Sequence, residues 1–221
     1  MPSFVSPALA AGTFAGSAQP EIRGDGVLLR PWRETDRAAV VAGYADPAIQ
    51  QWHCRTMTPE EAAAWIAAWP HRWRSETGAG WAVVDTGELS PPDGGAASGP
   101  ENYGSAGSDG GGSAASDSGR AVGQISFRRI DLDGGSAEIS YWVLPGSRGR
   151  RIAPRALSAL TNWAFTDLGL HRLELNHSTA NTASCRVATR AGFPAEGTKR
   201  AEARHADGWH DMHQHARLAT D

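Results

Sequence analysis

A short basic loop is the first stretch of the sequence whose residue types and spacing could do chemistry. It follows an apolar run that ends at Pro145, precedes an Ala/Leu-rich segment typical of a helix, and contains Arg148, Gly149, Arg150 and Arg151. A helix N-terminus presents unpaired N–H groups and the positive end of the helix dipole, so it attracts anions. Gly149 lets the backbone approach a ligand closely, and the arginines can add charge-assisted hydrogen bonds. The loop therefore predicts a pyrophosphate site, with an exposed basic turn as the alternative.

A polar pair, Asn181 and Ser184, stands near the start of another expected helix. On residue types alone, Asn181 or Thr182 caps this helix, and Ser184 is a solvated residue of its first turn. The pair gains a chemical interpretation only from the resemblance described below.

Four side chains elsewhere could move a proton. Glu138 and Glu202 lie in expected strands, although most such carboxylates are surface charges. His53 and His177 have an intrinsic pKa suited to proton transfer. Residue type alone does not choose among them.

A histidine-rich stretch near the C-terminus, HDMHQH, raises the question of a metal. His213 and His215 would share one face of a strand, and His210 is close. No cysteine and no obvious fourth ligand accompany them in the sequence, and a zinc site requires a specific ligand geometry. We therefore expect a strand that faces solvent or the acceptor, and no metal.

The elements that would position these residues alternate between strands and helices. Thr58, Pro59 and Glu61 form a typical helix start with a capping box, and Pro70 should end or kink that helix. The expected strands are 27–32, 81–85, 121–130, 137–144, 171–177 and two around an Ala-Asp-Gly turn; the expected helices are 34–46, 58–69, 153–167 and 181–193. This order predicts a mixed α/β (α+β) fold with helices on both faces of a central sheet.

The predicted domain organisation rests on one segment whose composition differs from that of the rest of the chain. Residues 86–119 include ten Gly, seven Ser and five acidic residues with no basic one, so they cannot bury enough apolar surface to fold. We expect a flexible insertion within a single domain, 21–221, preceded by a partly ordered arm, 1–20. The arm has no basic residue and no long apolar centre, unlike a secretory signal.

Charge and cysteine content limit the function classes. The net charge is −3, which gives no global attraction to nucleic acid or to an anionic membrane. No apolar run is long enough to span a bilayer. Two distant cysteines, Cys54 and Cys185, give no disulfide framework, which favours the cytoplasm.

Four segments together resemble the GNAT superfamily of acetyl-coenzyme-A-dependent N-acetyltransferases, and within it the RimJ/RimL-type branch. The resemblance covers roughly Val27 to the C-terminus, apart from the insertion, and the segments occur in the order that the family has. They are VLLRPWRETDRAAVVAGYADPAIQQW, AEISYWVLPGSRGRRIAPRAL, LHRLELNHSTANTASCRVATRAGF and EGTKRAEARHADGWHDMHQHARL. One departure stands out, because Arg151 occupies the position where the family's loop usually has its central Gly.

The resemblance implies a site and a fold. The expected strand at 137–144 would splay from its neighbour and bind the pantetheine arm of coenzyme A. The residues implied in cofactor binding are Trp142, Val143, Leu144, Arg148, Gly149, Arg150, Arg151, Ile152, Ala153, Asn181 and Ser184. The N–H near Val143 would polarise the thioester, Ser184 would protonate the departing thiolate, and Glu202 would act as base through water. The register around Glu202 is open by one residue, since Ala203 is its neighbour.

The acceptor pocket is expected among tryptophans before and within the helix at 58–69. Trp52 and His53 are the better pocket candidates, with Glu138 nearby, while Trp65 and Trp69 are better explained as core. The implied activity is acetyl transfer from acetyl-CoA to a primary amine, on a protein N-terminus or a small metabolite or antibiotic. The alternatives are a non-catalytic coenzyme A-binding regulator and an interaction module. Exposed tryptophan would favour a homodimer.

Overall fold

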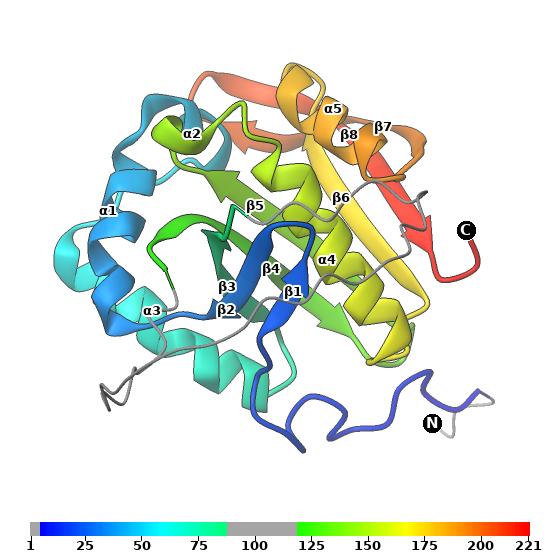
Figure 1. Cartoon of the computed structure of the whole chain (residues 1–221). Helices are drawn as coiled ribbons and strands as arrows, with labels where there is room; N and C mark the ends of the chain where they lie inside the picture. Colours follow the sequence, from blue (N-terminus) through cyan, green and yellow to red (C-terminus); the bar gives the residue numbers. More distant parts are fainter. Residues whose placement is uncertain (1–4, 88–118) are drawn as a thin grey trace, which may run out of the picture.

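The computed structural model describes residues 5–87 and 119–221, which form one eight-stranded sheet covered by helices (Figure 1). The insertion expected at 86–119 therefore lies almost wholly outside the described residues. Within the described part of the chain, no helix combines the length and the apolar character needed to cross a lipid bilayer.

The elements follow the predicted alternation, with one short strand and one short helix added. The strands are β1 (Ile22–Gly24), β2 (Val27–Pro31), β3 (Ala79–Asp85), β4 (Ala121–Asp131), β5 (Ser136–Val143), β6 (Arg172–Ser178), β7 (Ala195–His205) and β8 (Gly208–Leu218). The helices are α1 (Arg37–Ala45), α2 (Pro47–His53), α3 (Pro59–Arg74), α4 (Ile152–Thr166) and α5 (Thr182–Arg190), with 3₁₀ turns η1 (Glu34–Asp36) and η2 (Pro145–Ser147).

The strands lie in the order β1-β2-β3-β4-β5-β6-β8-β7, and every neighbouring pair is antiparallel except β5 and β6. The parallel pair ends at Ile139 and Leu175, although β5 continues to Val143 and β6 to Ser178. The two strands therefore part beyond Ile139, which confirms the expected splayed pair.

Helices cover both faces of the sheet, as predicted. α4 and α5 pack on one face, where the core includes Leu157, Ala188 and Ile139 of β5. α1, α2 and α3 pack on the other, where the core includes Val40 and Trp142 of β5. The side chains of a strand point to alternate faces of its sheet. Ile139 therefore packs in the hydrophobic layer on one face of β5, and Trp142 packs in the layer on the other face.

α3 begins as predicted and ends later than predicted. The Thr58 hydroxyl accepts from the Glu61 N–H at 3.2 Å, and the Glu61 carboxylate accepts from the Thr58 N–H at 2.8 Å, which completes the capping box. Pro70 does not end the helix, which continues to Arg74. Trp69 and Trp73 are both 4% exposed, and burial of these indoles on either side of the proline offsets the backbone hydrogen bond that it removes.

The segment 5–20 lies against the core. Phe14 is fully buried and meets the Trp73 ring edge-to-face at 5.2 Å between centroids. The Glu76 carboxylate accepts from the N–H groups of Gly12 and Phe14 at 2.8 and 2.7 Å, and the Trp73 indole donates to the Ser17 carbonyl at 2.8 Å. These contacts anchor the segment to the end of α3.

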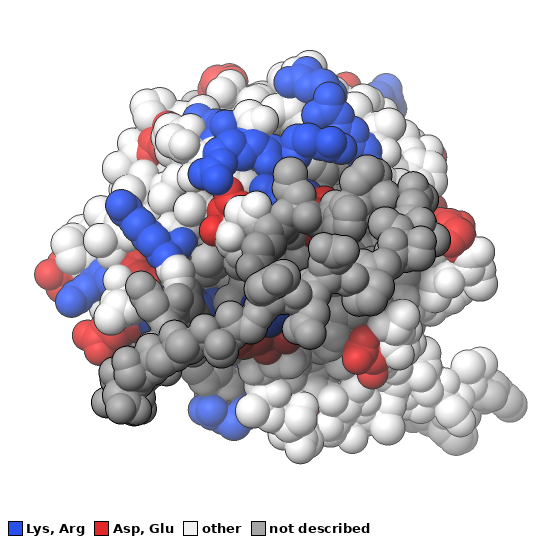
Figure 2. Space-filling view, viewed as in Figure 1, with Lys and Arg blue, Asp and Glu red and all other residues white. Residues whose placement is uncertain are grey.

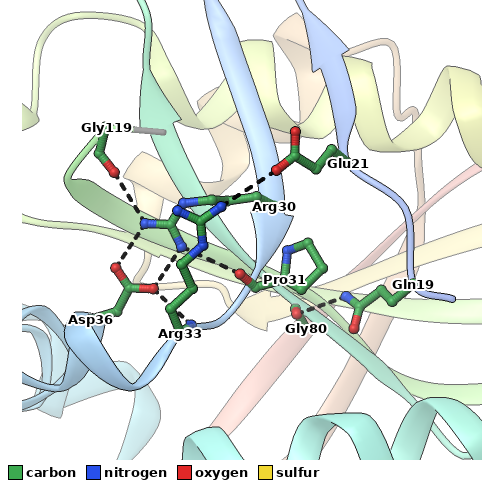
Figure 3. Close-up of polar contacts among 8 residues, drawn as sticks. All are labelled: Gln19, Glu21, Arg30, Pro31, Arg33, Asp36, Gly80 and Gly119. Atoms are coloured by element: carbon green, nitrogen blue, oxygen red, sulfur yellow. Dashed lines mark hydrogen bonds and ion pairs between the residues drawn. The ribbon is translucent and has the colours of Figure 1, made fainter. Parts of the chain in front are cut away.

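A buried ion pair ties β2 to the start of α1 (Figure 3). Arg30 is 2% exposed and Asp36 is 6% exposed, and the guanidinium Nη1 and Nη2 lie 2.6 and 2.8 Å from the two carboxylate oxygens. Asp36 also accepts from the Arg33 N–H at 2.9 Å, and Arg30 donates to the Gly119 carbonyl at 3.1 Å. This bidentate geometry with further hydrogen bonds is what a buried pair requires.

Candidate functional site

A cleft of about 900 Å³ opens where β5 and β6 part. Its walls come from all five helices, from strands β4 to β8 and from the basic loop before α4. The predicted site residues that line it are Trp52, His53, Trp142, Val143, Arg148, Gly149, Arg151, Ile152, Ala153, Asn181 and Ser184. Leu144, Arg150, Glu138 and Glu202 do not line it.

The edge of β5 presents backbone groups to this cleft. Trp142 pairs with Gln124 of β4 and the Leu144 N–H donates to the Val122 carbonyl at 2.9 Å, so these residues point their backbone toward β4. The backbone groups of successive residues in a strand point to opposite edges, so the N–H and carbonyl of Val143 point away from β4. The Arg148 Nε donates to the Val143 carbonyl at 3.2 Å, which agrees with that direction. The Val143 N–H therefore faces the opening between β5 and β6.

The basic loop has two residues in the left-handed region of backbone space. Gly149 has φ of +80°, and Arg151 has φ of +58° and ψ of +22° at the N-cap of α4. The left-handed region favours glycine, which explains physically why a glycine is typical at the Arg151 position. The first intrahelical bond runs from the Arg155 N–H to the Arg151 carbonyl at 3.2 Å. The N–H groups that precede it point out of the helix start.

Two arginines of the loop are engaged with the protein itself. Arg148 lies 2.5 Å from Asp46 and Arg150 lies 2.5 Å from Asp85. Within the described residues, no carboxylate forms an ion pair with Arg151, which is exposed. Figure 2 shows Lys and Arg side chains gathered over the start of α4. Arg151 is therefore the loop arginine with a guanidinium available to an anion.

Asn181 and Ser184 occupy the first turn of α5, at the cleft. The Asn181 Oδ1 accepts from the Ser184 N–H at 3.0 Å, so Asn181 caps the helix as its residue type indicates. Asn181 is 8% exposed, and both residues line the cleft. The capping role fixes Ser184 at the cleft wall, where its hydroxyl can meet a ligand.

Tyr141 is a cleft residue that the sequence interpretation did not single out. Its hydroxyl donates to the Ser184 carbonyl at 3.5 Å. Burial raises the pKa of Tyr141 to about 12. In the sequence, the only sign that Tyr141 faces the cleft is its position two residues after Ile139, which puts both side chains on the same face of the strand.

The acceptor end of the cleft is aromatic. The Trp52 ring meets the rings of His205 and His210 edge-to-face, at 5.9 and 6.2 Å between centroids, and those two rings lie 4.4 Å apart. The His53 Nε2 lies 3.3 Å from the Tyr141 carbonyl, and since a carbonyl can only accept, Nε2 donates. Burial lowers the pKa of His53 to about 4, so its imidazole is neutral at pH 7. Trp65 and Trp69 line the cleft from α3 while packing in the core.

The two carboxylates considered as bases lie outside the cleft lining. Glu202 is exposed and forms an ion pair with Lys199 at 3.0 Å, whereas the neighbouring Ala203 lines the cleft. Glu138 accepts from the Asn176 amide at 3.4 Å and lies 3.6 Å from Arg128. This placement does not support either residue as the base.

Arginine dominates the charge of the cleft. Among the described residues that line it there is no Asp or Glu, and the eight arginines are Arg55, Arg72, Arg128, Arg148, Arg151, Arg186, Arg190 and Arg204. A cleft lined by one sign of charge raises the local concentration of ligands of opposite charge. The cleft therefore suits an anionic ligand along much of its length.

A hydrogen-bonded chain leads from the cleft to the surface. Ser178 lines the cleft and is 2% exposed, and its hydroxyl lies 2.7 Å from the His210 Nδ1. The His210 Nε2 lies 2.9 Å from the Asp207 carboxylate, which is 60% exposed. Serine, histidine and aspartate in this order can pass a proton from the cleft to solvent.

Comparison with known proteins gives a consistent result. Residues 27–194 match the family model described as an acetyltransferase (GNAT) domain. The chain is 33% identical over 97 residues to the ribosomal-protein-serine acetyltransferase of Escherichia coli (strain K12), which is 44% of this chain and 54% of that protein. The chain spans about half the length of the curated relatives it matches.

Two solved structures show the same fold. Mycobacterium smegmatis RimJ in complex with a CoA disulfide has a TM-score of 0.68 at 23% identity, over 91% of this chain and 87% of that one. The microcin C7 self-immunity acetyltransferase MccE, solved with acetyl-CoA and AMP, has a TM-score of 0.65 at 16% identity, over 88% of this chain and 93% of that one.

Proposed function

The chain belongs to the GNAT acetyltransferase family, and we propose that it transfers the acetyl group of acetyl-CoA directly to a primary amine bound in the same cleft. The observation that carries the proposal is the parting of β5 and β6 beside the start of α4. It offers one ligand both an open strand edge and a helix N-terminus that binds anions. The RimJ and MccE structures, solved with a CoA disulfide and with acetyl-CoA, support the same cosubstrate here.

Acetyl-CoA would lie along the open edge of β5. Its pantetheine amides pair with the backbone of Tyr141 and Val143 in the manner of an added strand. Its pyrophosphate meets the N–H groups between Gly149 and Ala153, where the dipole of α4 favours negative charge. The free guanidinium of Arg151 adds a charge-assisted contact. All five of these residues line the cleft, which supports this placement.

The chemical step needs a polarised thioester and a proton for the thiolate. The Val143 N–H faces the opening and is the donor proposed for the developing oxyanion. The amine nitrogen attacks the carbonyl carbon and the carbon–sulfur bond breaks. The Ser184 hydroxyl passes its proton to the sulfur and takes one from solvent water in the open cleft, so the serine ends unchanged. The place of Ser184 in the first turn of α5, at the cleft wall, supports this role.

The amine must also lose a proton, and no carboxylate among the described cleft residues can take it. We assign this role to His210, acting through the Ser178 hydroxyl at 2.7 Å, with Asp207 stabilising the imidazolium at 2.9 Å. His53 is a poorer base at pH 7 because burial lowers its pKa to about 4. His53 then contributes to the shape of the acceptor end.

The charge of the cleft indicates the class of acceptor. Arg55, Arg128 and Arg204 line its acceptor side, away from the basic loop. The relative from Escherichia coli is named for a ribosomal-protein serine. Both observations favour a peptide N-terminus with acidic residues after the first one, because arginine pairs with carboxylates in two-point contacts.

A peptide panel tests the proposal. The enzyme is incubated with acetyl-CoA and matched N-terminal peptides whose following residues are acidic, neutral or basic, and mass spectrometry detects the added acetyl group. We expect acetylation of the acidic peptides, with Arg55→Gln raising KM for them more than for the neutral ones. A phosphate-bearing amine acetylated in preference to every peptide would overturn the acceptor class. Coenzyme A binding with no turnover on any amine would instead favour the regulator.

A further inference from the structure

Three histidines and a cysteine meet between α5 and the sheet, and one of them, His177, also lines the cleft. His177 lies on β6 directly opposite His213 of β8, and His215 stands two residues further along β8. These three side chains share one sheet face, and α5 brings Cys185 onto that face. Each of the four residues offers one ligand atom, and these atoms all lie within 4.8 Å of one another.

The hydrogen bonds of two of these histidines fix which nitrogen is free. The Nδ1 atoms of His177 and His215 lie 2.8 and 2.9 Å from the carbonyls of Ser178 and Phe193. A carbonyl only accepts, so each Nδ1 carries the hydrogen and each Nε2 keeps a lone pair. His177 is 5% exposed and His215 is 2% exposed, and neither Nε2 has a hydrogen-bond partner among the described residues.

Two buried nitrogen lone pairs without a donor are an unfavourable arrangement in a folded core. A metal ion removes the conflict, because a ligating histidine commonly donates its other ring N–H to a backbone carbonyl. Both histidines already have that second hydrogen bond. The arrangement is therefore the one that a ligated imidazole adopts.

We propose that His177, Cys185, His213 and His215 bind one Zn²⁺ ion in a closed tetrahedral site. Zinc takes imidazole nitrogen at about 2.0–2.1 Å and thiolate sulfur at about 2.3 Å, and four protein ligands mark a structural site. Ligand atoms in such a tetrahedron stand about 3.3–3.6 Å apart. Closing the group from 4.8 Å takes side-chain movements of about 1 Å. Mg²⁺ and Ca²⁺ prefer oxygen ligands, which this group lacks.

The ion would anchor α5 to the sheet. Ala188 is the only buried residue of α5 in the described structure, and the partly buried Val187 packs against the same core. Cys185 directly follows Ser184 in the first turn, and zinc ligation by its sulfur would set the position of that turn at the cleft wall. The site does not depend on the proposed acetyl transfer, since its four ligands include none of the groups assigned to the reaction.

Metal analysis of the untagged protein tests the proposal. The protein is loaded with Zn²⁺, dialysed against a weak chelator, and analysed for metal by mass spectrometry. We expect one zinc per chain, and we expect Cys185→Ser and His213→Ala each to weaken zinc binding by more than about 100-fold, since outer-shell partners alone contribute about 10–100-fold. Both positions are only partly buried, and circular dichroism checks that the variants remain folded.

A matched control comes from the other cysteine of the chain. The Cys54 sulfur lies 3.4 Å from His205, and Cys54 is exposed, so Cys54→Ser reports zinc bound adventitiously at the surface. It should retain one zinc. Loading with Co²⁺ should produce a thiolate-to-cobalt charge-transfer band that Cys185→Ser abolishes and Cys54→Ser keeps. The proposal is overturned if the protein retains no zinc after dialysis, or if Cys185→Ser retains as much zinc as the original protein. Either result holds whether or not the protein acetylates amines.

Discussion

Replacement of Arg151 by glycine should stabilise the protein, although it removes a charged side chain. Arg151 has φ of +58° and ψ of +22°, a conformation that costs a residue with a Cβ about 1–2 kcal/mol. Glycine removes that cost, but its greater freedom in the unfolded chain lowers the stability of the fold by about 0.5–1 kcal/mol. The balance favours Arg151→Gly by about 0.5–1 kcal/mol, which corresponds to about 1–4 °C in Tm for a chain of this size.

Two comparisons isolate this backbone effect. Arg151→Ala also loses the guanidinium but keeps the Cβ, so it should be less stable than Arg151→Gly by about 0.5–1 kcal/mol. Arg150 has no positive φ and pairs with Asp85. At that position the order should reverse, with Arg150→Gly less stable than Arg150→Ala by about 0.5–1 kcal/mol.

Urea unfolding monitored by circular dichroism measures all four variants, and calorimetry measures their coenzyme A affinity. Both Arg151 variants should bind coenzyme A up to about tenfold more weakly, since an exposed charge-assisted hydrogen bond contributes about 1 kcal/mol after screening. If Arg151→Gly is no more stable than Arg151→Ala, the left-handed conformation at residue 151 carries no strain and the reasoning fails.

Three further predictions follow from the site and the core. Ser184→Ala should lower kcat by at least about 100-fold with coenzyme A affinity unchanged, as expected for loss of a general acid; an unchanged single-turnover rate would remove Ser184 from the mechanism. The pKa of His53 falls from 6.5 to about 4 on folding, so its protonation favours the unfolded state; stability should be complete above pH 6.5 and fall by up to about 3 kcal/mol as the pH drops to 4. His53→Gln should flatten this dependence in urea unfolding at several pH values, and an identical slope in both proteins would contradict the assignment. Asp36→Asn should cost about 3–5 kcal/mol in the same assay because it leaves the Arg30 charge buried and uncompensated, whereas the double replacement Arg30→Met, Asp36→Leu should cost less; equal losses would show that the pair itself stabilises the fold.

Short-range patterns predicted the strand, loop and helix around the start of α4 well. The strand before Pro145, the loop through Arg151 and the helix that follows are encoded within about twenty residues, as is the Thr58–Glu61 capping box. Local propensity and capping chemistry act over such distances. These elements therefore lie where the sequence indicated, and the cleft lining includes most of the residues named in advance.

The register of β7 could not be predicted from alternation. The strand has a register shift between Lys199 and Ala203, and Ala201 within it has φ of +46°. A bulge of this kind changes which residues face inward. It brings Ala203 to the cleft and leaves Glu202 outside it, and nothing in the residue types of the strand marks the bulge.

Residues that are far apart in the sequence but close in the fold were also beyond what the sequence could predict. Sequence spacing placed His213 and His215 on one face of a strand, but it did not bring Cys185 or His177 to them. Their meeting depends on β8 lying between β6 and β7, and on α5 crossing the same face. Sheet order is a property of the whole fold, so the proposed zinc site, which draws its residues from three elements, leaves no local motif.

A short ladder between β5 and β6 joins two halves of the sheet, β1 to β5 and β6 to β8. Four residue pairs link β5 to β6, whereas eight link β4 to β5 and seven link β6 to β8. Amide protons at this joint should exchange before those of the β4–β5 and β6–β8 ladders beside it, because local opening begins where fewer bonds must break. A bulky substrate could therefore enter by a slight rotation of one half against the other, with no strand having to unfold.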